Sequence, residues 1–105
     1  MAYVRTYPSV SPDNGIERQV LSDSPGLMVV AFTFAAGATG ARHSHPHMQA
    51  SYVESGRFRF EIGDEAFEVG PGDSFVVPSN AEHGCLCLEP GRLIDTFTPR
   101  RDDFL

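Results

Sequence analysis

The sequence predicts an all-β protein, either a closed barrel or a two-sheet jelly roll of about eight short strands. Residues 57–62 alternate polar and apolar side chains without interruption, which is typical of an antiparallel strand with one buried face. No window of about a dozen residues has apolar side chains at helical spacing, and 10 glycines and 8 prolines interrupt the chain. Because 105 residues correspond to one ordinary domain, we expect a single domain over residues 1–105.

Turn residues separate the expected strands. Gly63 and Asp64 predict a hairpin between residues 57–62 and 65–69. A second turn at residues 70–73 leads into a strand that Pro78 ends. The other expected strands are residues 16–21, 27–34, 49–54, 74–77, 85–88 and 92–97. Residues 3–7 also alternate and could add to a partner's sheet, and residues 99–105 either fray or fold back over the barrel.

Charge, apolar runs and cysteine content limit the kinds of partner and the cellular compartment that we expect. The chain has 8 basic and 14 acidic residues, a formal charge of −6, which argues against nucleic acid as a partner. The longest apolar run is far shorter than a membrane span of roughly 20 residues, and residues 1–8 lack a secretory pattern. Cys85 and Cys87 are too close in sequence to form a disulfide framework. We therefore expect a cytoplasmic protein with two reduced thiols.

Three of the four histidines lie within residues 43–47. In a strand, His43 and His45 would point to the same face, as two ligands of a mononuclear metal site do. Pro46 would distort the strand and could bring Gln49 into the same pocket, with the distant His83 as a fourth ligand. His47 follows the proline and fits a surface or supporting role better. The competing interpretation is a solvated loop that holds no metal.

These residues resemble the two motifs of the cupin family. The first motif is matched by Gly37, His43, His45, Gln49 and Gly56, and the second by Gly72, Pro78, Ala81, Glu82 and His83. The resemblance implies a cupin-type double-stranded β-helix, a jelly-roll barrel. Three positions depart from the usual motifs, because Gln49 replaces a glutamate, Asn80 a glycine and Cys87 an asparagine.

The segment from His43 to Gln49 is further similar to small cupins of pectin and alginate degradation, which linearise unsaturated uronates. In that group three histidines and a glutamine hold one divalent metal ion, which implies His43, His45, His83 and Gln49 as ligands here. The group's C-terminal pattern implies Asp95, Phe97 and Arg101 as catalytic residues, with Arg100 as the alternative for the arginine.

The resemblance implies the conversion of 4,5-unsaturated monouronates to linear 4-deoxy-5-keto-hexuronates. Four neutral ligands leave the ion its full charge, suited to hold the substrate carboxylate and the C5 oxygen. In this interpretation Asp95 moves a proton between the anomeric hydroxyl and C4, Phe97 caps the pocket, and Arg101 pairs with the carboxylate. If the phenylalanines of residues 57–62 faced outward, their alternating arginines, Arg57 and Arg59, would line the pocket instead.

Other functions fit the same residues. Three histidines could hold Fe(II) in a small cupin dioxygenase, and a sugar- or small-acid-binding cupin without activity is a further alternative. A storage-type barrel is disfavoured because it would not need a complete ligand set. The ligands suit nickel, zinc, iron or manganese. We expect a homodimer, the commonest assembly for such a barrel.

Overall fold

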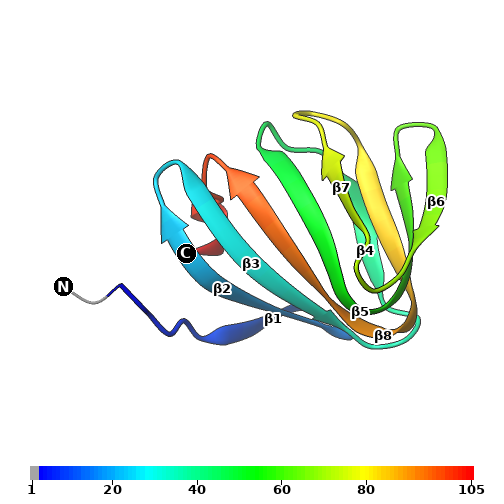
Figure 1. Ribbon diagram of the computed structural model, residues 1–105, viewed down its shortest axis with the longest axis horizontal. Helices are drawn as coiled ribbons and strands as arrows, with labels where there is room; N and C mark the ends of the chain where they lie inside the picture. The colour runs from blue at the N-terminus through cyan, green and yellow to red at the C-terminus, as the bar shows by residue number, and fades with distance from the viewer. Residues whose placement is uncertain (1–2) are drawn as a thin grey trace.

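The computed structural model of the protein describes residues 3–105, so the first two residues of the expected domain lie outside it. Among the described residues it has eight strands and one short 3₁₀ helix (Figure 1). The strands are β1 (Ser9–Asp13), β2 (Ile16–Ser24), β3 (Leu27–Phe34), β4 (Thr39–His43), β5 (Met48–Ile62), β6 (Glu65–Val69), β7 (Ser74–Val77) and β8 (His83–Thr98). The helix, η1, spans Asp102–Phe104. The all-β prediction is confirmed.

β5 and β8 are long strands that belong to both layers of the barrel. The first part of β5 pairs with β7 and with the last part of β8, which also pairs with β3. The last part of β5 pairs with β6 and with the first part of β8, which also pairs with β4. The prediction of separate strands at 49–54 and 57–62, and at 85–88 and 92–97, is therefore wrong.

Two glycines explain that error, because they bend the strands without ending them. The β5–β8 register shifts between Val53 and Phe58. Gly56 has a φ of +80°, and a Cβ there would lie 2.6 Å from the Cα of Gly91. A Cβ on Gly91 would lie 2.1 Å from the carbonyl oxygen of Ser55. The backbones thus approach at a distance that only glycine allows, and residues that look like a turn in sequence form the corner of the barrel.

The turns and the terminal segments can also be compared with their predictions. The hairpin between β5 and β6 is confirmed, with Ile62 opposite Glu65, and the turn before β7 is closed by the Gly70 amide donating to Asp73. Residues 3–7 form no strand within this chain, whose N-terminal strand is β1, and their pairing with a partner's sheet stays a prediction. The C-terminal tail folds back, with Phe104 packed against Phe32 and Phe97.

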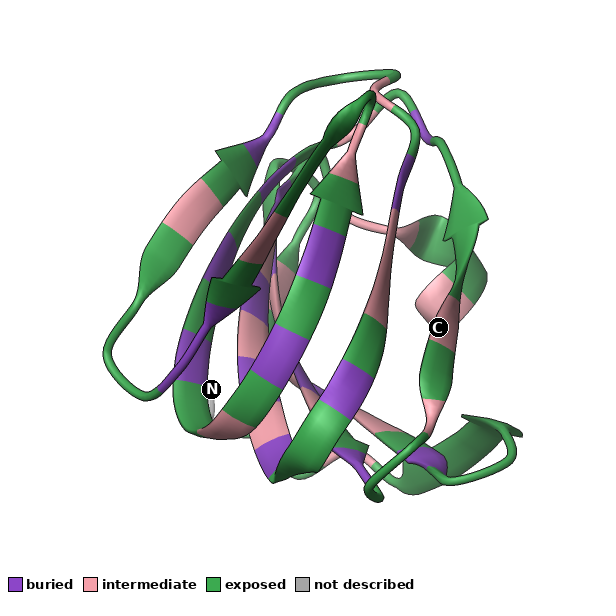
Figure 2. Cartoon of the chain, turned by 90° about the vertical axis from the view of Figure 1, so that its right-hand side faces the viewer, coloured by how far each residue is buried: buried purple, intermediate pink, exposed green. Residues whose placement is uncertain are grey.

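Burial alternates along the strands as the sequence predicts (Figure 2). In β5, Phe58 and Phe60 are buried whereas Arg57 and Arg59 are exposed, so the arginines lie outside the barrel. In β8, Leu93, Asp95 and Phe97 all face inward. The core has two clusters, one centred on Phe34, Val53 and Phe58 and a smaller one of Val20, Met28, Val30 and Phe97. No described helix is long and apolar enough to cross a membrane.

Candidate metal centre and substrate cavity

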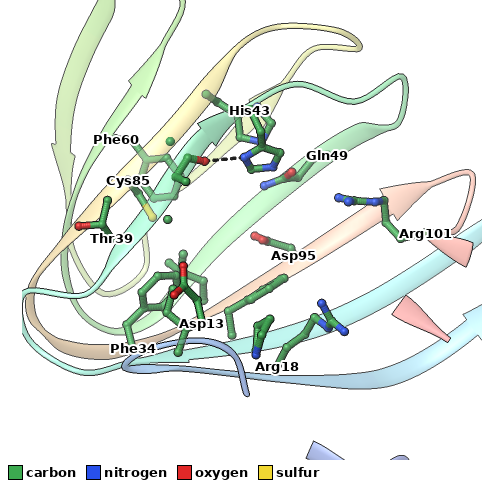
Figure 3. Close-up of a pocket in the computed structure, with 18 of the residues that line it drawn as sticks. Asp13, Arg18, Phe34, Thr39, His43, Gln49, Phe60, Cys85, Asp95 and Arg101 are labelled. Carbon is green, nitrogen blue, oxygen red and sulfur yellow. Dashed lines mark hydrogen bonds between the residues drawn. The ribbon is translucent and has the colours of Figure 1, made fainter. Parts of the chain in front are cut away.

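A cavity of about 320 Å³ opens between the two layers of the barrel. Residues of β1, β2, β3, β4, β5 and β8 line it, together with Arg101 and Phe104 of the tail. In the view of Figure 3, His43 and Gln49 lie above Asp95, Arg101 lies to its right and Arg18 lies below it. The cavity is of the size of a small-molecule site, and polar groups converge on it.

His43, His45 and His83 lie together, and His43 and His83 line one end of the cavity. One ring nitrogen from each lies within 4.8 Å of the other two, which is suitable for a shared metal ion. His43 ends β4 and is paired with His83 at the start of β8. His45 lies beyond β4 in the loop before β5, so the prediction that it shares a strand with His43 is wrong. Pro46 lies in the middle of this loop, residues 44–47, where it offers no amide to a sheet.

Backbone carbonyls orient all three imidazole rings. The Nδ1 atoms of His43, His45 and His83 lie 2.7, 3.0 and 2.9 Å from the carbonyl oxygens of residues 41, 47 and 81 (Figure 3 draws the first). A carbonyl oxygen only accepts, so each Nδ1 donates and each Nε2 keeps a lone pair. Burial lowers the pKa of His45, and it lowers that of His83 to about 4. The buried rings are therefore neutral at pH 7, as metal ligands must be.

Gln49 adds an oxygen to this cluster. Its Nε2 donates to the Oγ of Ser51 at 3.0 Å, which turns Oε1 toward the Nε2 of His45 at 3.1 Å. Because the Nδ1 of His45 carries the ring proton, Oε1 and Nε2 are two lone-pair acceptors that face each other. A cation bound by both atoms satisfies this arrangement, so the donor set fits a divalent metal ion.

Asp95 is a buried carboxyl group without a full set of partners. It faces the cavity from β8, and its Oδ1 is buried with no hydrogen-bond partner among the described residues. Burial raises the pKa of Asp95 to about 7, although a hydrogen bond from Ser51 and the charge of Arg101 oppose the rise. Such a group can both take and give a proton near neutral pH.

The tail covers the cavity beside Asp95. Phe97 is buried, with its ring centroid 5.7 Å from that of His45 and 5.8 Å from that of Phe104. Arg101 lines the cavity, and its Nε and Nη2 lie 3.1 and 2.9 Å from the carboxylate oxygens of Asp103. Arg100 instead pairs with Asp23 and Asp102 outside the cavity. Of the two adjacent arginines, Arg101 is thus the one that faces the site.

Some residues of the cavity were not identified from sequence. Arg18 lines it from β2, and the alternation of residues 16–20 could have placed this side chain inward. Cys85 also lines it, but burial raises the pKa of its thiol to about 12, so the thiol is protonated. Both cysteines are reduced, as predicted. His47 contributes its carbonyl oxygen to His45 and lies outside the cluster of ligands.

The barrel and its histidine cluster define a small metal-binding cupin. Residues 30–97 match the family model described as a cupin domain, and the chain belongs to the cupin family. It is 43% identical over 94 residues to the pectin degradation protein KdgF of Dickeya dadantii, an alignment that covers 88% of this chain and 86% of that protein.

Two solved structures are similar to it over nearly the whole chain. The structure of KdgF from Halomonas sp. is 40% identical with a TM-score of 0.90, and the match covers 94% of this chain and 92% of that one. An RmlC-like cupin from Shewanella frigidimarina is 39% identical with a TM-score of 0.91, over 94% and 89% of the two chains.

Proposed function

We propose that the protein converts 4,5-unsaturated monouronates derived from pectin or alginate to linear 4-deoxy-5-keto-hexuronates. The observation that carries the proposal is the placement of a buried carboxyl group, Asp95, whose Oδ1 has no hydrogen-bond partner among the described residues, in the same cavity as the histidine–glutamine cluster. The similarity to a pectin degradation protein supports a sugar acid as the substrate.

The ligands of the metal ion are His43, His45, His83 and Gln49. One divalent ion, of nickel, zinc, iron or manganese, suits three imidazole nitrogens and one amide oxygen. With four neutral ligands it keeps its full positive charge, and when bound it supplies a Lewis acid that stabilises negative charge on a substrate oxygen.

The reaction is an isomerisation, so its atoms balance without an oxidant or a second substrate. The anomeric hydroxyl loses its proton, the bond from C1 to the ring oxygen breaks, and C1 becomes an aldehyde. The ring oxygen is left as an enolate at C5, and a proton added to C4 converts that enolate to a ketone. One group that takes a proton at the first position and returns it at the second is sufficient.

Asp95 is the group that moves this proton. Its pKa of about 7 makes both protonation states accessible at neutral pH, and its Oδ1 is not engaged by another residue of the described chain. Phe97 is buried next to this site and excludes water from the enolate. An enolate that reached water would be protonated there instead of by Asp95. Arg101 directs positive charge at the carboxyl group of Asp95 and favours its return to the ionised form.

The proposal includes a cytoplasmic homodimer. Met48, Tyr52 and Val76 are 48%, 46% and 56% exposed on β5 and β7, which gives an apolar surface that a second copy could cover. Sedimentation velocity distinguishes a dimer from a monomer.

Nuclear magnetic resonance of the product tests the reaction itself. The protein is incubated without oxygen with an unsaturated monouronate in deuterated water. We expect an isomeric product with a C5 ketone and deuterium at C4. A requirement for oxygen, or a product with added oxygen, would replace the proposal with the dioxygenase alternative. Saturable binding without conversion would favour a binding protein.

A further inference from the structure

Arg18 occupies an inward position of β2. Ile16 and Val20, two residues away on either side, are 7% and 5% exposed and belong to the core clusters. Side chains two apart in a strand share a face, so Arg18 points into the barrel between two apolar neighbours, and it is paired in register with Phe32. A charged side chain at such a position usually has a partner that compensates its loss of water.

The guanidinium of Arg18 has no such partner. It makes no hydrogen bond or ion pair with any residue in 3–105, and its Cζ lies 4.2 Å from the ring centroid of Phe104. The group lines the cavity that also contains Asp95 and Arg101. Burial lowers the pKa of Arg18, the charge of Asp103 opposes this shift without forming an ion pair, and the charge of Arg101 adds to it. The stacked ring holds the plane of the guanidinium while its N–H groups stay available to a ligand.

Arg101 is in the opposite situation. Its Nε and Nη2 form a two-bond pair with the carboxylate of Asp103, at 3.1 and 2.9 Å. A substrate carboxylate that used this edge of Arg101 would have to displace Asp103 first. Both arginines lie 4.2 Å from the centroid of Phe104, so they stand at the same end of the cavity. Arg101 is therefore neutralised by Asp103, whereas Arg18 has no ion-pair partner among the described residues.

We propose that Arg18 binds the carboxylate of the sugar acid and so selects charged over neutral sugars, whereas Arg101 is a positioning residue held by Asp103. The inference rests on the proposed function for the identity of the substrate. A carboxylate matches the N–H fork of an unpaired guanidinium in shape and charge, and no other uncompensated cation among the described residues lines this cavity.

The test compares the binding of D-galacturonate and D-galactose, a saturated acid and its neutral counterpart, by isothermal titration calorimetry. We expect the wild-type protein to prefer galacturonate and Arg18→Gln to lose about tenfold or more of that preference. Arg18→Lys should lose part of it, since it keeps the charge without the fork. Arg59→Gln is the matched control, because Arg59 is exposed outside this cavity.

Kinetics with the unsaturated monouronate give a second, independent readout. Arg18→Gln should raise KM by a similar factor and leave kcat within about threefold. Equal binding of the two sugars by the wild type would overturn the inference. So would a preference that survives Arg18→Gln but disappears in Arg101→Gln.

The failure of the proposed function can be told apart from the failure of this inference. Loss of galacturonate preference in Arg18→Gln by a protein that does not linearise uronates would uphold the anion site and refute the reaction. Unchanged KM and binding in a folded Arg18→Gln that still linearises uronates would refute the anion site and uphold the reaction. Arg18→Met keeps the volume of the side chain, and a melting temperature no lower than that of the wild type excludes a purely structural role.

Discussion

At the histidine end of the cavity each ring is oriented by a contact close in sequence, whereas the opposite end is built from β2 and the tail, which meet only in the folded protein. Each of the three imidazoles is oriented by a carbonyl two residues away. Arg18 and Phe104, by contrast, come from opposite ends of the chain. The orientation of the three rings therefore depends on local backbone geometry, whereas the position of Arg18 depends on the packing of the tail against β2.

The largest effect is expected at the histidine end. His45→Ala removes a ligand and the partner of Gln49, so it should abolish stoichiometric metal binding and lower kcat/KM by about a thousandfold or more. Metal content by mass spectrometry and turnover are measured on the same sample. His47→Ala is the control, since it keeps the backbone carbonyl that orients His45. Full metal content in His45→Ala would contradict the assignment.

Asp95→Asn tests the proton-transfer role of Asp95 separately from metal binding at the histidine end. It should retain the metal and lower kcat by about 10² to 10⁴, because the amide cannot carry the proton. Asp13→Asn is the matched control: Asp13 also lines the cavity, but it is exposed and its carboxylate accepts from the amide of residue 14. A wild-type rate in Asp95→Asn would remove the acid–base role while leaving the metal centre intact.

Ser51→Ala tests a hydroxyl group that lies between Gln49 of the histidine end and Asp95. Ser51 accepts from Gln49, and its hydroxyl group lowers the pKa of the neighbouring Asp95, so its loss frees the amide of Gln49 to rotate. We expect metal affinity to fall about tenfold, as for other residues that orient a ligand. A competition titration with a chelator measures it. An unchanged affinity would show that Gln49 is oriented by other contacts.

A smaller effect is expected on the stability of the metal-free protein. The pKa of Asp95 is about 7 in the folded protein and about 4 when unfolded. The folded state therefore holds the extra proton between these values, and the contribution of Asp95 to the free energy of unfolding falls as pH rises from 4 to 7. His83 acts in the opposite sense: its pKa is lowered to about 4, so its contribution rises between pH 4 and 6.5.

Metal-free Asp95→Asn keeps only the second of these effects. Its free energy of unfolding should thus rise from pH 4.5 to 7 relative to that of the wild type, by a few kcal/mol at most. Urea unfolding in the presence of a chelator at both pH values gives the difference. Parallel pH dependences in the two proteins would show that Asp95 is ionised normally.

The same contrast between local and distant contacts explains how much the sequence could predict. His43, His45, Gln49 and His83 lie in recognisable motifs, and alternation indicated the strands and the hairpin at Gly63. The strands were expected to end before Gly56 and Gly91, because only the close approach of the two backbones in the folded protein shows that the strands bend there and continue. Arg18 was overlooked, since a charged residue in a strand is ordinarily expected to face solvent.

Ultraviolet absorbance of an unsaturated monouronate tests the central claim most directly, because the conjugated double bond absorbs and the keto product does not. We predict that the metal-loaded protein removes the signal much faster than buffer alone, that a chelator abolishes the acceleration, and that a divalent ion restores it. Decay no faster than in buffer, with a full complement of metal confirmed on the same sample, would contradict the assignment of this cavity to uronate linearisation.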